Sequence, residues 1–186
     1  MIRTALLSLL FTSFGSAIAL ADETPHAVVT PADIKWVEAP PTIPAGAKLA
    51  LLQGDPARPG FYVFRLMLPA NYRLPVQSHP AELAITVVSG TPVLGTGDKV
   101  DPAAKTSPAG SFMPIAAKTN HYVTTKKETV LELSGVGPFA IAYANPDEDP
   151  NKGAAVLEPK SFSNQYYRDT TNRYVNEATK KANSRR

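Results

Sequence analysis

The sequence contains no cysteine and only three histidines among its 186 residues. Without cysteine the chain can form no disulfide and cannot be lipidated on an N-terminal cysteine, so its fold depends on the burial of apolar side chains. Nucleophile-elbow, glycine-rich phosphate-binding and zinc-protease helix motifs are also absent from the sequence. These absences leave hydrolase and nucleotide-binding functions without support.

An apolar N-terminal stretch follows a short positive start, because Arg3 precedes a run over residues 5–20 with few polar side chains. The run is short, contains small residues and ends in Ala-Leu-Ala before Asp22, which is typical of a secretory signal peptide. We therefore expect residues 1–21 to be removed by cleavage after Ala21, giving a periplasmic or secreted protein. A retained anchor is disfavoured, because no Lys or Arg cluster follows the run, and the mature chain has no other long apolar stretch to form a transmembrane segment.

Charge divides the rest of the chain into two parts. Residues 22–150 carry ten basic and thirteen acidic side chains, a net charge of −3, whereas residues 151–186 carry eight basic and three acidic ones, a net charge of +5. We expect an N-terminal linker over residues 22–32, one domain over 33–150 and a basic C-terminal extension, solvated or partly helical, over 151–186. Nucleic acid is not an expected partner of an exported protein, but contact of the extension with anionic lipid or envelope polymers stays open.

The central part of the chain favours strands over helices, because short runs of β-branched and aromatic residues alternate with Pro, Gly and Asp. Proline-rich stretches at residues 39–44 and 101–108 are expected to be loops. Nine short strands at this spacing predict an all-β sandwich or barrel. The expected strands cover residues 34–37, 49–53, 61–68, 84–89, 92–95, 111–115, 121–125, 129–134 and 139–143.

Two of the three histidines lie beside expected strands. His79 comes just before the strand at residues 84–89 and His121 begins another strand, whereas His26 lies in the N-terminal linker. Side chains two residues apart on a strand face the same side, so Gln77 and His79 can point at a common centre. Any chemistry of the domain must come from few residues, and these are the first candidates.

The stretch that contains His79 resembles the first motif of the cupin superfamily: residues 69–90 (PANYRLPVQSHPAELAITVVSG) run from a proline-rich turn to a strand ending in Ser-Gly. Residues 110–122 (GSFMPIAAKTNHY) resemble the second motif, and residues 135–143 (GVGPFAIAY) a third shared feature. The resemblance implies a cupin-type jelly-roll β-barrel over residues 33–150. Immunoglobulin-like and lipocalin-like carriers are the alternatives, and the order of the motifs argues against them.

Cupins hold a divalent metal, such as iron, manganese, zinc or nickel, through two histidines spaced two apart, a glutamate and a later histidine. By this resemblance His79 matches the second histidine of the pair and His121 the late one, while Gln77 replaces the first histidine. The glutamate position falls on Leu83, with Glu82 one residue earlier. The metal-ligand candidates are therefore His79, His121, Gln77 and Glu82.

The departures from the motif weaken the expected metal site. An amide oxygen is a harder and weaker donor than imidazole for a transition metal. Glu82 has the wrong parity for a regular strand, which would place Leu83 and Ile85 inward, although an irregular turn at residues 80–81 would let the carboxylate swing in. Leu83 and Ile85 are accordingly candidates for the lining of a ligand pocket.

Arg65 lies inside an apolar strand, on the face that it shares with Phe61, Val63 and Met67. If that face points inward, the guanidinium would orient a carboxylate-bearing ligand. General burial preferences favour the other arrangement, with Arg65 on the outer face and paired with an acid.

Three functions stay open for an exported cupin. The first is binding of a small organic ligand in the barrel, through a divalent metal held by His79 and His121. The second is a metal-dependent enzyme of the dioxygenase or isomerase type, for which the sequence assigns no catalytic residue. The third is a metal-free binding or scaffold protein of the cell envelope. A homodimer, which cupins often form, is a further expectation.

Overall fold

The computed structural model describes residues 28–152. The predicted signal peptide (1–21), most of the predicted linker and almost all of the predicted basic extension (151–186) lie outside the described residues. Within them the chain forms ten β-strands and two short 3₁₀ helices, η1 (Pro31–Asp33) and η2 (Pro146–Glu148). No helix of this part of the chain is long and apolar enough to cross a membrane.

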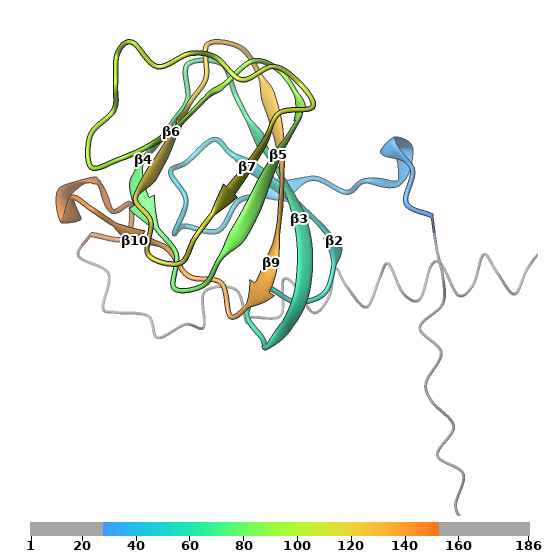
Figure 1. Cartoon of the computed structure of the whole chain (residues 1–186). Helices are drawn as coiled ribbons and strands as arrows, with labels where there is room; N and C mark the ends of the chain where they lie inside the picture. The colour runs from blue at the N-terminus through green and yellow to red at the C-terminus, as the bar shows by residue number, and fades with distance from the viewer. Residues whose placement is uncertain (1–27, 153–186) are drawn as a thin grey trace, which may run out of the picture.

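The strands form two antiparallel sheets, which Figure 1 shows as two layers with β4, β6 and β10 on one side and β2, β3 and β9 on the other. Neighbouring strands in each sheet are often distant in sequence, as in the pairing of β3 with β9, which is typical of a jelly-roll. The larger sheet consists, in order, of β1 (Val37–Glu38), β2 (Lys48–Gln53), β3 (Gly60–Leu68), β9 (Thr129–Gly137), β5 (Leu83–Ser89) and β7 (Phe112–Ile115). The smaller sheet consists of β10 (Ala142–Tyr143), β4 (Arg73–Ser78), β8 (His121–Thr124) and β6 (Val93–Thr96).

The core lies between the two sheets and follows from alternation along the strands. In β3 the side chains of Tyr62, Phe64, Leu66 and Leu68 are buried, whereas the residues between them are only partly buried. The strands β5 and β9 alternate in the same way. Because the side-chain period of a strand is two residues, one face of each strand is committed to the core. The all-β jelly-roll expected from the sequence is confirmed.

One strand, β4, was not predicted from the sequence, because Pro75 lies in its middle and its surroundings were interpreted as a turn. Proline cannot donate a ladder hydrogen bond and is tolerated where the pairing is irregular. The pairing of β4 with β8 shifts register between Leu74 and Gln77, at the position of this proline. The expected strand at residues 139–143 is also shorter than predicted, since only β10 at its end is formed.

Candidate functional site

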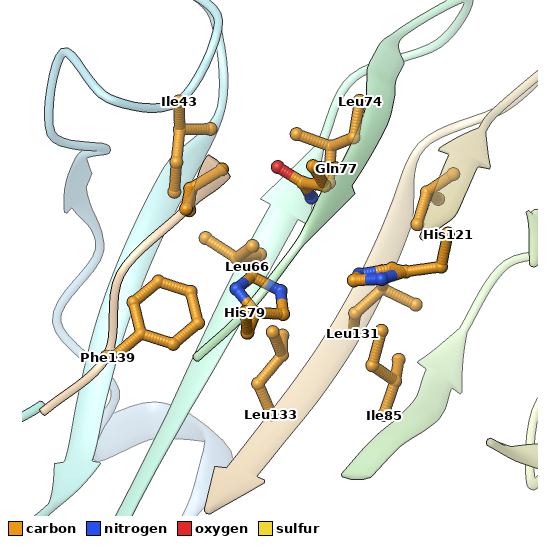
Figure 2. Close-up of a pocket in the computed structure, with 12 residues that line it drawn as sticks. Ile43, Leu66, Leu74, Gln77, His79, Ile85, His121, Leu131, Leu133 and Phe139 are labelled. Atoms are coloured by element: carbon orange, nitrogen blue, oxygen red, sulfur yellow. The ribbon is translucent and has the colours of Figure 1, made fainter. Parts of the chain in front are cut away.

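The interior between the two sheets contains a cavity of only about 10 Å³, which is about the volume that one water molecule requires. Its walls are mostly aliphatic and its polar side chains are three in number (Figure 2). The lining residues are Ile43, Leu66, Leu74, Gln77, His79, Ile85, His121, Val123, Leu131, Leu133, Phe139 and Ile141.

The polar side chains of the cavity come from β4, from the residue directly after it and from β8. Gln77 in β4 is the cross-strand partner of His121 in β8, and His79 follows Gln77 by two residues, so the three side chains share one face. Their exposed fractions are only 4% for Gln77, 4% for His79 and 1% for His121. Figure 2 shows the two imidazole rings facing each other, and their centroids are 4.9 Å apart.

Each imidazole is held by a backbone carbonyl through the same ring nitrogen. Nδ1 of His79 lies 2.7 Å from the carbonyl oxygen of Ala140, and Nδ1 of His121 lies 3.0 Å from that of Thr119. A carbonyl oxygen only accepts hydrogen bonds, so each Nδ1 carries the proton and donates it. In a neutral ring the lone pair then lies on Nε2, the arrangement that ligating histidines use in metal sites.

Both rings are neutral at neutral pH. Burial lowers the pKa of His79 to about 4, against a smaller raising effect of the bond to Ala140 and a further lowering effect of His121. Burial also lowers the pKa of His121, and its bond to Thr119 acts in the opposite direction. The cavity therefore contains two unprotonated Nε2 atoms at neutral pH.

Gln77 adds a third acceptor to the cavity. Its side-chain oxygen Oε1 is buried and has no hydrogen-bond partner, which is rare for a buried polar atom because the loss of water is not compensated. Two imidazoles with lone pairs on Nε2 and the amide of Gln77 thus line a small space with mostly apolar walls. A cation or a hydrogen-bond donor would satisfy all three groups.

The structure brings Gln77, His79, His121 and Ile85 together around the cavity, but not the other site candidates. Glu82 is exposed, since the inward position at the start of β5 belongs to Leu83 and a shift of one residue reverses the face. Leu83 is buried in the core without lining the cavity. The expectation that Glu82 would swing inward therefore does not describe this structure.

Arg65 lies on the outer face of the larger sheet, not in the cavity. Its Nε donates to Oε2 of Glu132 at 2.9 Å, and the two residues are cross-strand partners in β3 and β9. This is the arrangement that burial preferences favoured, because the inward positions of β3 are filled by aromatic and aliphatic side chains. Arg65 thus orients no ligand inside the barrel of this structure.

Eight of the twelve lining residues were not singled out from the sequence, among them Phe139 and Ile43. Phe139 packs on His79 with ring centroids 4.7 Å apart, and Ile43 enters the cavity from the proline-rich segment before β2. The only signal for Ile43 was a single large apolar residue within a segment interpreted as a surface loop. Such contacts join segments that are distant in sequence, so a local sequence pattern does not predict them.

The donor set is smaller than that of a full cupin metal site. Among the residues that the structure describes, no group of three or more His, Cys, Asp and Glu side chains could hold a metal ion. The cavity is lined by two histidines and one amide side chain, and no carboxylate lines it.

Two antiparallel sheets in jelly-roll order, with two inward histidines at the two motif positions, define the chain as a member of the cupin superfamily. Within that class it belongs to the family described as "Domain of unknown function (DUF4437)", whose model matches residues 19–141. No curated protein matches the chain.

Solved structures agree with this fold at low sequence identity. The polyketide cyclase RemF from Streptomyces resistomycificus matches with a TM-score of 0.56 and 18% identity, over 74% of this chain and 99% of that one. A candidate acetylacetone dioxygenase from Methylibium petroleiphilum matches with a TM-score of 0.53 and 17% identity, over 69% of this chain and 87% of that one. At these identities the likeness concerns the fold alone.

Proposed function

We propose that this cupin binds one divalent transition-metal ion inside the barrel, through Nε2 of His79 and Nε2 of His121, with Oε1 of Gln77 as a third donor. The observation that carries the proposal is the pairing of two buried, neutral imidazoles, each with Nδ1 bound to a backbone carbonyl. The partnerless Oε1 of Gln77 lines the same cavity. Three acceptors around one small space favour a cation as the occupant.

The chemistry of the donors fits a borderline ion better than a hard one. Imidazole suits zinc, iron and nickel, whereas magnesium, calcium and manganese prefer carboxylate and water oxygens. The missing carboxylate leaves the donor set neutral, so affinity should be lower than for a site with three histidines and a glutamate. Of the four metals expected from the resemblance, manganese is therefore the least favoured.

A bound ion would supply a Lewis acid with open positions for a small organic ligand. The residues of this chain would then position and protect it. The carbonyls of Ala140 and Thr119 hold the two rings in one tautomer and orientation, and the side chains of Leu131, Leu133 and Phe139 exclude water. Organic-ligand binding is the second part of the proposal, and it requires more room than the closed cavity has.

Metal analysis of the full chain, expressed without an affinity tag, tests the first part. We expect about one ion per chain after incubation with iron, nickel or zinc salts and removal of the excess. His121→Ala should abolish this binding, while His26→Ala, which changes the one histidine outside the described residues, serves as the matched control. No metal above background in the unchanged protein, or equal retention by all three proteins, would contradict the proposal.

A metal-free ligand-binding barrel is the second candidate function. The observation that favours it is Leu83, an apolar side chain at the position of the family's glutamate, with the carboxylate of Glu82 outside. In that case Nε2 of the two histidines would accept hydrogen bonds from a donor group of the ligand. Absence of metal in the same analysis, together with calorimetric binding of a small alcohol or amine that His121→Ala abolishes, would select this candidate.

Export is part of the proposed function, supported by the pattern of residues 1–21. We expect the protein in the periplasmic or secreted fraction, with a mature N-terminus at Asp22. N-terminal sequencing of the protein recovered from each cell fraction measures both. A cytoplasmic product that keeps Met1 would overturn this part without bearing on the metal site.

A further inference from the structure

A surface segment between β1 and β2 covers the cavity, and we call residues 39–47 the strap. The N–H of Ala39 donates to the carbonyl of Ala47 at 2.9 Å, so the ends of the strap lie together. Inside it, the N–H of Ile43 donates to the carbonyl of Pro40 at 2.9 Å and closes a turn with Pro41 at its second position, a position that proline favours. Compact loops with closed ends frequently carry function.

Ile43 is the strap residue that lines the cavity, while Ala47 at the end of the strap is buried in the core. Pro41 and Ala45 are exposed, whereas Ile43 has an exposed fraction of only 3% and lines the cavity with Gln77 and His79. Figure 2 shows Ile43 on the side of Gln77, entering from a segment outside the sheets that carry the histidines. The closed cavity of about 10 Å³ is far below the roughly 300–1,000 Å³ of ligand pockets.

Two tyrosine hydroxyls bind the strap on either side of Ile43. The hydroxyl of Tyr143 in β10 donates to the carbonyl of Thr42 at 2.8 Å, and the hydroxyl of Tyr72 donates to the carbonyl of Pro44. Burial raises the pKa of both tyrosines, so both keep the proton that they donate. The carbonyls immediately before and after Ile43 are thus both held by tyrosines that lie in the smaller sheet or directly before one of its strands.

The strap is the part of the wall that can move at least cost. Leu66, Ile85 and Leu131 lie in strands of the larger sheet that are paired on both sides, so displacing them would break ladder hydrogen bonds. Within the described residues, the strap's hydrogen bonds to the rest of the fold are those from the two tyrosines. The buried hydroxyl of Thr42 has no partner at all.

We propose that the strap is the gate of the barrel, that Ile43 is its plug, and that Tyr72 and Tyr143 hold it closed. Ile43 then determines which small organic molecules reach His79 and His121, since none fits beside it in the closed state. The meaning of the gate for a metal-bound ligand rests on the proposed function. Opening of the strap is independent of the proposed function, because it can be measured in metal-free protein.

Carbethoxylation by diethyl pyrocarbonate measures this opening. The reagent attacks unprotonated imidazole nitrogen and is far larger than the cavity, so His79 and His121 react only from an open state. The full chain is treated with a chelator and reacted at neutral pH, and peptide-resolved mass spectrometry gives the rate at each histidine. When closing is fast, that rate is proportional to the open fraction.

The variants remove separately the tyrosine hydroxyls that hold the strap closed and the side chain of the plug, Ile43. Tyr143→Phe and Tyr72→Phe should each raise the rates at His79 and His121 by about twofold to tenfold, the factor that corresponds to one net hydrogen bond. Ile43→Ala should raise them by about tenfold or more, because the closed state loses a buried aliphatic side chain. Each variant is compared at equal temperature below its own unfolding transition.

Tyr122→Phe is the matched control. Tyr122 is buried, with an exposed fraction of only 1%, but its hydroxyl accepts the N–H of Asp101 on the loop after β6, away from the strap. We expect its rates at the two histidines to equal those of the unchanged protein. Acceleration by the three strap variants but not by Tyr122→Phe supports the gate.

Two outcomes would overturn the proposal: rates unaffected by the strap variants, or equal acceleration in Tyr122→Phe, which would indicate global opening instead. If Ile43→Ala fails to fold, the tyrosine variants still decide, since each removes a single oxygen atom. Failure of the metal proposal gives a different result. The carbethoxylation rates of the metal-free protein would be unchanged, and only the metal analysis would show that no ion binds.

Discussion

The buried histidine His79 should make the metal-free protein sensitive to acid. Its pKa in the fold is about 4, below the ordinary value of 6.5, because burial disfavours the charged ring. As the pH falls below 6.5, the unfolded chain binds a proton at this position that the folded protein does not bind. The free energy of unfolding therefore decreases between about pH 6.5 and about pH 4, and His79 contributes nothing further below that range.

The size of this effect follows from the gap between the two pKa values. The gap between 6.5 and about 4 corresponds to a loss of about 3 kcal/mol, at about 1.4 kcal/mol per pH unit. Solvent screening reduces it little, since His79 is only 4% exposed. A loss of this size is a large part of the stability of a domain, which is typically about 5–15 kcal/mol.

Urea unfolding at several pH values, in the presence of a chelator, measures the effect. The comparison is with His79→Asn, whose amide can donate to the carbonyl of Ala140 but does not titrate. Both proteins keep His121, so the difference between their pH profiles reports the titration of His79 together with its interaction with His121. The unchanged protein should lose about 3 kcal/mol more than the variant between pH 7.5 and pH 4. Parallel profiles would refute the claim that His79 is buried as a neutral ring.

Three further changes test individual placements. Glu82→Gln should leave zinc affinity unchanged in calorimetry, because the carboxylate is exposed and outside the cavity; weaker binding would mean that it swings inward. Arg65→Ala should lower the free energy of unfolding in urea by no more than about 1 kcal/mol, since its bond to Glu132 is partly exposed, and loss of zinc binding in this variant would contradict its outward position. Gly95→Ala should cost about 1–3 kcal/mol in the same assay, because an added Cβ would lie 2.1 Å from Cζ of Tyr122; an unchanged unfolding midpoint would contradict this packing.

Much of the fold could be predicted from the sequence, because it is encoded in local alternation. In the run over residues 61–68 only Arg65 is charged, and because side chains alternate along a strand, the sequence places Arg65 on the face opposite to Phe64 and Leu66; the structure shows that the face of Phe64 and Leu66 is the inward one. The strand β4 escaped prediction because a proline at a register irregularity cannot be distinguished locally from a proline in a turn. That strand places Gln77 opposite His121.

The candidate site was predictable in part for the same reason. Spacing indicated that Gln77 and His79 share a face, and motif order related them to His121. The parity argument against Glu82 was available from the sequence, but the competing irregular turn at residues 80–81 could only be decided by the position at which β5 begins.

The sequence by itself determined most of the strand pattern and the all-β class, which follow from residue type along each segment, and it placed Gln77 and His79 on one face by their spacing, while the resemblance related them to His121. Only the tertiary structure decided how small the cavity is, which ring nitrogens of His79 and His121 are left with lone pairs, and that Ile43 of the strap covers them. The volume of a cavity and the atoms left unpaired in it depend on contacts between segments distant in sequence, and a local sequence pattern does not specify those contacts.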